Sequence, residues 1–140
     1  VMAGEVAWLS QGIVEAVEKS PVCERIILTG GVSVYELRGL YQKTKLFAFP
    51  SLYEGFGLPV LEAFASKVPV LVAENSSLRE VAGEAAWYCD PFDVDDIAEA
   101  LQCLLDRPEL CQRLIALSQE QLKKFSWEKT TRETLEFIQK

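Results

Sequence analysis

The sequence of 140 residues contains no histidine, and its basic side chains are outnumbered. Without histidine, a Ser-His-Asp triad, a histidine metal site and a histidine pH switch are all excluded. The 14 Lys and Arg residues stand against 21 Asp and Glu, a net charge of −7 that disfavours electrostatic binding to nucleic acid or anionic membranes. No apolar run approaches the roughly 20 residues of a membrane span. The first residues also lack the basic and apolar regions typical of a signal peptide.

Cysteines are few and isolated. Cys23, Cys89, Cys103 and Cys111 form no Cys-x-x-Cys pair, so we expect four buried, reduced side chains rather than a zinc or redox motif. Half of the chain is hydrophobic and no linker or repeat divides it, which predicts a single domain over residues 1–140. The chain begins in what resembles the end of a strand, so we expect it to be a fragment of a larger protein.

Short apolar runs alternate with amphipathic stretches along the chain. Strands are predicted at 25–29, 45–49, 69–73 and 85–89, each apolar enough to be covered on both faces. Helices are predicted at 8–19, 34–42, 58–66, 78–82, 94–105, 108–123 and from 127 onwards. This alternation predicts an α/β fold, a Rossmann-like parallel sheet with helices on both faces. Ligands of such sheets bind at the carboxyl ends of the strands.

Local signals define where several helices begin. Ser33 with Glu36 forms a capping box, and Asp93 and Ser126 are expected N-caps. The segment 75–77 could cap the helix at 78–82 or belong to a loop that lines the site, and we expect the cap. The acidic residues between 90 and 96 are expected to favour a helix N-terminus rather than a cation site. Trp8, Trp87 and Trp127 are expected in the core.

One segment carries the chemistry. After the strand at 45–49 the chain contains Glu54, then Gly55 and Gly57, then Pro59 at the start of a helix. Glycines permit a close backbone approach, and proline suits the first helical turn. A helix that opens beyond the carboxyl end of a strand offers free N–H groups and the positive end of its dipole. This loop therefore predicts an anion site.

Glu62 is the only charged residue between 58 and 66, in a helix that is otherwise apolar and expected to be buried. A buried carboxylate needs a polar partner. The residue types leave two alternatives open: a lysine or backbone N–H as a structural partner, or ligand hydroxyls such as the cis-diol of a ribose. Glu54 taken alone is typical of a solvated turn, but two glutamates eight residues apart around Gly-Phe-Gly-Leu-Pro form a specific pattern.

The segment from Phe49 to Ala63 resembles the Glu-x7-Glu signature of retaining glycosyltransferases of group 1, or family 4, which have the GT-B fold. The resemblance continues through Thr29 to Ser33, Leu40-Tyr41, and the later segments at 68–70, 76–86, 90–98 and 125–127. It covers essentially the whole chain. It implies the C-terminal, donor-binding half of a GT-B enzyme, with the first strand, loop and helix of that half missing.

The resemblance also implies a role for each matching residue. Glu54 would contact hydroxyls of the donor sugar at the reaction centre, and Glu62 would bind the ribose. Backbone N–H groups of the donor-binding loop, Gly55, Phe56, Gly57 and Leu58, would approach the sugar and diphosphate. Gly30, Gly31 and Val32 would lie near the base. No metal site and no cofactor other than the nucleotide-sugar donor, a GDP- or UDP-hexose, is implied.

The chain departs from the full family pattern, because it lacks the N-terminal acceptor domain and the Arg and Lys that bind the diphosphate. We therefore expect that it binds a donor but does not catalyse transfer alone. The full enzyme would be a hexosyltransferase, for example a mannosyltransferase of polysaccharide synthesis, acting on a glycan or lipid-linked acceptor. A cytoplasmic location is expected, with any peripheral contact at the inner membrane face made by the missing half. Two alternatives remain: a non-catalytic nucleotide-binding or regulatory α/β module, and a degenerate glycosyltransferase partner subunit.

Overall fold

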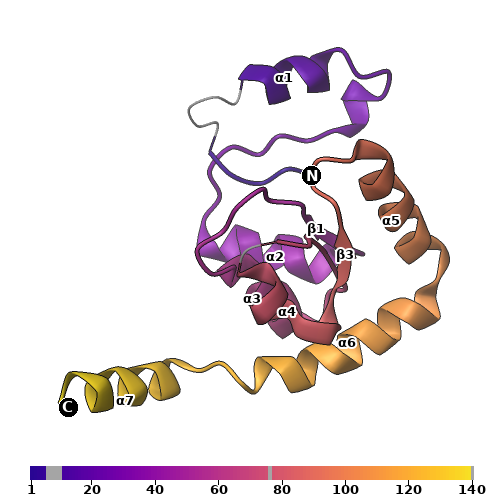
Figure 1. The fold of residues 1–140 in the computed structure, drawn as a ribbon. Helices are drawn as coiled ribbons and strands as arrows, with labels where there is room; N and C mark the ends of the chain where they lie inside the picture. Colours follow the sequence, from indigo (N-terminus) through magenta and orange to yellow (C-terminus); the bar gives the residue numbers. More distant parts are fainter. Residues whose placement is uncertain (6–10, 76, 140) are drawn as a thin grey trace. The chain divides into compact units, whose positions relative to one another are not determined.

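The computed structural model describes residues 1–5, 11–75 and 77–139, which group into two compact units, Val1–Leu40 and Tyr41–Lys140. The first unit contains helix α1 (Gln11–Glu18), the 3-10 turn η1 (Cys23–Arg25) and the beginning of α2 (Val34–Lys43). Figure 1 shows the elements in chain order.

The strand predicted at 25–29 is not formed as a continuous strand. Its backbone makes two isolated bridges, Met2 with Leu28 and Gly4 with Gly30. The Met2 N–H donates to the Ile27 carbonyl at 2.8 Å, but Ile27 is 54% exposed. A ladder needs a neighbouring strand along its length, and in this unit the described residues offer only the short segment around Met2 and Gly4.

The second unit is built on a parallel sheet of three strands in the order β1-β2-β3. These are β1 (Phe47–Phe49), β2 (Val70–Ala73) and β3 (Trp87–Cys89), with Phe47 opposite Val70 and Leu71 opposite Trp87. All four residues of β2 are buried, as the apolar run predicts for a central strand covered on both faces. Three of the predicted strands and the α/β fold class are confirmed.

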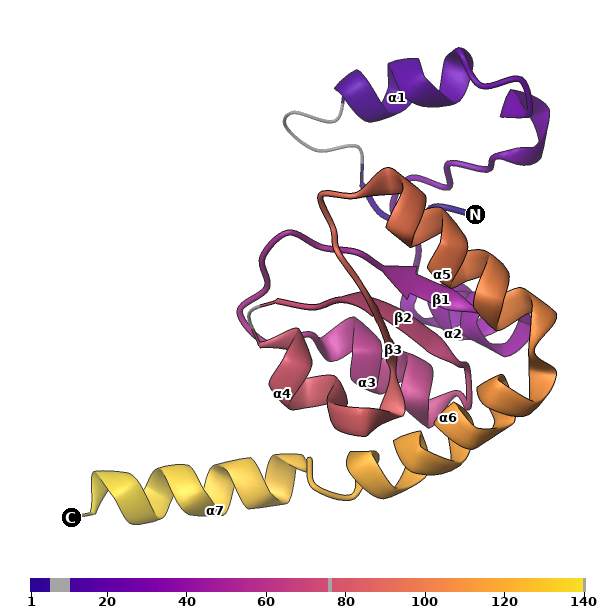
Figure 2. The ribbon, with the colours of Figure 1, turned by 45° about the vertical axis from the view of Figure 1, so that its right-hand side comes forward.

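Helices follow the strands in alternation. They are α3 (Leu58–Ala65), α4 (Leu78–Ala82) with the 3-10 turn η2 (Gly83–Ala85), α5 (Val94–Asp106), α6 (Pro108–Leu122) and α7 (Trp127–Ile138). Figure 2 shows α3 and α4 on one face of the sheet and α5 on the other. The loops that leave the carboxyl ends of β1 and β2 lie side by side at one edge, where ligands of parallel sheets bind.

The core lies between the sheet and its helices. Leu71 and Cys89 from the sheet pack with Ala100, Leu104 and Leu114 from α5 and α6. On the opposite face, the helix α3 contributes Val60, Ala63 and Phe64, all without exposed surface. Two glutamines of α6 complete this packing, since Gln119 donates to the Phe64 carbonyl at 2.7 Å and Gln121 to the Val81 carbonyl at 3.0 Å.

The helix caps predicted at Ser33, Asp93 and Ser126 are confirmed in detail. The Ser33 N–H and hydroxyl donate to the Glu36 carboxylate at 2.8 and 2.7 Å, and the Glu36 N–H lies 3.3 Å from the Ser33 hydroxyl. Asp93 accepts hydrogen bonds from two N–H groups of α5, and Ser126 from the Lys129 N–H of α7.

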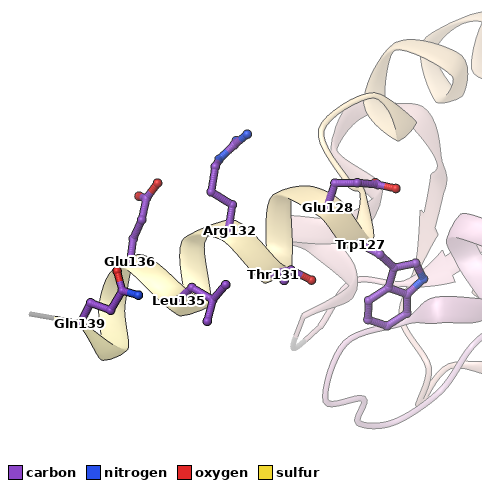
Figure 3. Close-up of a pocket in the computed structure, with 7 residues that line it drawn as sticks. All are labelled: Trp127, Glu128, Thr131, Arg132, Leu135, Glu136 and Gln139. Atoms are coloured by element: carbon purple, nitrogen blue, oxygen red, sulfur yellow. The ribbon is translucent and has the colours of Figure 1, made fainter.

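Some predictions of burial are wrong, and one falls outside the described residues. Trp127 is 75% exposed, because α7 buries none of its residues. Cys23 is exposed in the first unit, and Cys103 and Cys111 are only partly buried. Trp87 packs against the core as predicted, whereas Trp8 lies outside the described residues. Figure 3 shows Trp127, Thr131 and Leu135 along one side of α7, lining a shallow surface hollow with residues of that helix alone.

No helix within the described ranges is long and apolar enough to cross a membrane.

Candidate donor site

The loop after β1 is held by side chains from the loop after β2. Asn75 Nδ2 donates to the carbonyls of Ser51 and Leu52, at 3.0 and 2.9 Å. Figure 2 shows the two loops side by side at the carboxyl edge of the sheet, and these contacts join them. The backbone before Glu54 is therefore fixed by a residue more than twenty positions further along the chain.

Ser77 extends the same connection, and here the structure corrects the sequence interpretation. Its hydroxyl makes no capping hydrogen bond to α4. Instead, it lies 2.9 Å from the Glu54 carbonyl and 2.8 Å from the Phe56 carbonyl. Asn75 and Ser77 thus support the glycine loop, and the Ser77 hydroxyl donates to one of the two carbonyls at a time rather than capping α4.

Glu54 lies in this supported loop and is half-buried. The Ser51 hydroxyl donates to its Oε1 at 2.8 Å, which orients the carboxylate. The residue is therefore not the freely solvated turn glutamate that its position alone would suggest. A carboxylate oriented beside a glycine loop is suited to accept hydrogen bonds from ligand hydroxyls.

Gly57 makes the turn from the loop into α3. Its φ of 115° lies in the left-handed region, and a Cβ there would stand 2.9 Å from Leu78 Cδ2. The helix opens immediately afterwards with Pro59 in its first turn, as predicted. The positive end of the α3 dipole thus lies beside Gly55, Phe56, Gly57 and Leu58, where an anionic group would be stabilised.

Phe56, at the exposed side of this loop, packs edge-on against Phe125, with ring centroids 5.9 Å apart and planes at 87°. Phe125 lies in the short segment that joins α6 to α7. The glycine loop is therefore supported from the segment between α6 and α7 as well as from the loop after β2.

Glu62 departs from the prediction, because it is exposed rather than buried. The buried face of α3 consists of Val60, Ala63 and Phe64, and the side chain of Glu62 leaves the helix outside that face. Its partner is neither a lysine nor a backbone N–H. The Tyr41 hydroxyl lies 3.2 Å from Glu62 Oε2.

Tyr41 was not singled out as a site residue by sequence reasoning. It lies in the last part of α2, in the second unit, and is only 6% exposed. Its ring meets Phe47 of β1 edge-on, with centroids 5.4 Å apart. Burial raises the pKa of Tyr41, and the nearby Glu62 carboxylate raises it further, so the hydroxyl keeps its proton. The available signal was the pair Leu40-Tyr41, at the end of a helix that leads into the strand before the glutamates.

Gly30, Gly31 and Val32 lie in the first unit, in the turn that precedes α2. Gly30 has a φ of 66°, and its carbonyl accepts hydrogen bonds from the Gly4 N–H at 3.1 Å and the Thr29 hydroxyl at 2.9 Å. A conformation in which glycine is favoured is thus present at this turn. The role of these residues beside a base stays a prediction.

Arg79, which follows Ser77 closely in the chain, is engaged by other groups. Arg79 of α4 pairs with Glu74 and lies over the Tyr88 ring, 4.7 Å from its centroid. Across residues 1–5, 11–75 and 77–139, no three Cys, Asp or Glu side chains gather in a way that could hold a metal ion. The acidic group at the end of β3 serves its predicted purpose, since Asp93 caps α5.

Comparison with known proteins assigns the chain to a family. A sequence profile of glycosyl transferases group 1 matches residues 1–121. The chain is 39% identical over 138 residues to O-antigen chain mannosyltransferase B of Escherichia coli, covering 96% of this chain and 35% of that protein. It is 35% identical over 116 residues to MMP alpha-(1->4)-mannosyltransferase of Mycolicibacterium hassiacum, covering 80% of this chain and 28% of that protein.

A solved structure agrees with these matches. Sucrose-phosphate synthase from Thermosynechococcus elongatus superposes with a TM-score of 0.82 at 25% identity, over 91% of this chain and 33% of that one. The chain spans about a third of the length of these relatives. One conclusion follows from the parallel sheet, the two glutamates around a glycine turn and the profile match over most of the chain. The chain belongs to the group 1 glycosyl transferases.

Proposed function

We propose that this chain is the donor-binding part of a retaining glycosyltransferase, which moves a hexose from a nucleotide-diphosphate sugar to a glycan or lipid-linked acceptor. The observation that carries the proposal is the arrangement at the carboxyl edge of the sheet. There a loop held by Asn75 and Ser77 presents Glu54, and the helix that follows it presents Glu62 beside Tyr41.

Each group has a role that suits its chemistry. The Glu54 carboxylate, oriented by Ser51, accepts hydrogen bonds from the donor-sugar hydroxyls near the reacting carbon. The exposed Glu62 carboxylate accepts from the ribose. The diphosphate lies at the N-terminus of α3, where the helix dipole favours negative charge. The turn of Gly30, Gly31 and Val32 packs near the base.

The leaving diphosphate needs further positive charge, which the rest of the polypeptide would supply. We therefore propose that this chain binds donor weakly on its own and does not catalyse transfer, and that the reaction needs no metal ion. Mannose is the hexose that we favour, because two relatives covering most of this chain are mannosyltransferases by name. The acceptor binds the remaining polypeptide, in the cytoplasm, at the inner membrane face where the acceptor is lipid-linked.

Nucleotide titration tests the binding role. Amide chemical shifts are recorded while GDP, UDP and ADP, and their hexose conjugates, are added to the chain. Shifts at Gly30–Val32 and across residues 54–62, with one base preferred, are the expected result. Shifts confined to α7 would contradict the proposed site.

Transfer by the complete polypeptide tests the catalytic role of Glu54. Glu54→Gln removes the charge while keeping the shape, and we expect it to lower kcat by at least tenfold. Glu109→Gln, in the first turn of α6, is the matched control and should leave transfer unchanged. Equal rates for the Glu54 variant and the control would refute the assignment.

A further inference from the structure

The contact between Tyr41 and Glu62 has a geometry that goes beyond packing. The Tyr41 hydroxyl lies between two acceptors, 3.2 Å from Glu62 Oε2 and 3.3 Å from the Pro59 carbonyl. Both acceptors belong to α3, whereas Tyr41 comes from α2. The hydroxyl of this buried ring thus donates its one hydrogen bond at the exposed surface of α3, the helix that carries Glu62.

The two side chains differ sharply in freedom. Tyr41 is 6% exposed and held edge-on by Phe47, so its hydroxyl has a fixed position. Glu62 is exposed and has three rotatable side-chain bonds, whose freedom is lost when a ligand is bound. A hydrogen bond from a fixed donor to a mobile carboxylate restricts the carboxylate before the ligand arrives, and such preorganisation strengthens binding.

The hydrogen bond leaves the carboxylate able to accept more. Each carboxylate oxygen has two lone-pair sites, and Tyr41 uses one of those on Oε2. From the part of the chain that the structure describes, no second donor reaches the Glu62 carboxylate. Oε1 and the remaining site on Oε2 can therefore face two neighbouring hydroxyls at once, which is the pattern of a vicinal diol.

The Pro59 carbonyl makes the arrangement tolerant of change at Glu62. If the carboxylate is removed, the Tyr41 hydroxyl can turn to the carbonyl 3.3 Å away. A buried hydroxyl is then never left without an acceptor, which avoids the cost of an unpaired polar group. Variants of Glu62 should accordingly fold normally.

We infer that Tyr41 is a positioning residue, which orients the Glu62 carboxylate so that it accepts both hydroxyls of the ribose of the donor nucleotide. The inference rests on the proposed function, because it takes Glu62 as the ribose ligand. It adds a residue from a different helix to the site and a measurable property, preference for the vicinal diol.

The test compares nucleotides with and without the diol. Binding of GDP and UDP, and of their 2′,3′-dideoxy counterparts, is measured by calorimetry on the complete polypeptide, for the native protein and for Tyr41→Phe. We expect the preference for the ribose form to fall about fivefold in Tyr41→Phe, the effect of one lost hydrogen bond. Affinity for the dideoxy forms should hardly change, because they do not use the carboxylate.

Two further variants separate positioning from packing. Glu62→Gln should also lower the preference for the ribose form. The double variant with Tyr41→Phe should show no further loss of that preference, since both changes act through one carboxylate. Tyr88→Phe is the matched control. It removes another half-buried tyrosine hydroxyl, one that donates to the Gly83 carbonyl away from Glu62, and should leave the diol preference intact.

The outcomes distinguish the two levels of the argument. If the native protein prefers the ribose form and loses that preference in Glu62→Gln but not in Tyr41→Phe, the inference is overturned while the proposed function stands. If the native protein binds no nucleotide, or binds both forms equally, the proposed role of Glu62 fails and the inference fails with it. If the preference for the ribose form falls in Tyr41→Phe and Glu62→Gln but not in Tyr88→Phe, both the proposed function and the inference are supported.

Discussion

Replacing Gly57 by alanine should destabilise the fold through two separate effects. The backbone at this position has a φ of 115°, which a residue with a Cβ adopts at a cost of about 1–2 kcal/mol. The new Cβ would also stand 2.9 Å from Leu78 Cδ2, and Leu78 is fully buried, so it cannot simply turn into solvent. Overpacking of this kind costs about 1–3 kcal/mol.

The two effects together give an expected loss of about 2–5 kcal/mol in the free energy of unfolding. For a chain of this size, that loss lowers the melting temperature by roughly 7–17 °C. Urea denaturation followed by circular dichroism measures the free energy, and calorimetry measures the melting temperature.

Gly55→Ala provides a close control for the same loop. A Cβ at Gly55 would meet nothing within 4 Å, and its φ lies outside the left-handed region. We expect a change in stability within about 0.5 kcal/mol, as for an ordinary surface substitution. If Gly57→Ala were as stable as Gly55→Ala, the argument that a left-handed, closely packed turn positions α3 would be refuted.

Three further variants test other parts of the structure. Ser77→Ala removes the hydroxyl that supports the carbonyls of Glu54 and Phe56. Calorimetric titration should show weaker nucleotide-sugar binding, and urea denaturation should show a loss of only about 1 kcal/mol in the free energy of unfolding. Leu104→Ala opens a cavity in the core, where Leu104 is 1% exposed, and should cost about 2–5 kcal/mol in urea denaturation; an unchanged midpoint would contradict this packing. Hydrogen bonds from Ser33 lower the pKa of Glu36 from its ordinary value of 4.5. A carboxyl group whose pKa is lowered on folding stabilises the protein at pH values above its pKa in the unfolded chain. That stabilisation is lost as the pH falls through its pKa in the folded protein. The urea midpoint should therefore drop less between about pH 7 and about pH 3 in Ser33→Ala than in the native protein.

The predictions that rested on local signals were the most accurate. Ser33, Asp93 and Ser126 each cap the predicted helix, because capping depends on the N–H groups two or three residues further along. Pro59 opens α3 for the same reason. The apolar run at 69–73 predicted the central strand, since a strand covered on both faces has no other composition.

Predictions that depended on distant partners were less accurate. The run at 25–29 is apolar enough for a strand, yet strand pairing requires a neighbour that its own sequence does not specify. Glu62 was expected to be buried because its helix is apolar, but only one face of α3 packs against the protein. Tyr41 and Ser77 reach the site from other elements, across some twenty residues of chain, so no local pattern indicated their contacts.

The contact of Phe56 with Phe125 affects where this protein can be shortened. A chain that stopped at the end of α6 would lose the ring that packs on the glycine loop at Phe56, although the strands β1 to β3 and the helices that cover the sheet would remain. A chain that stopped after Ser126 would keep that ring and would shed the apolar side chains that α7 exposes, Trp127, Leu135, Phe137 and Ile138. Exposed apolar stripes promote association at the concentrations that spectroscopy and crystallisation require. The best boundary for producing a soluble donor-binding domain therefore falls in the few residues between two helices rather than at the end of either one.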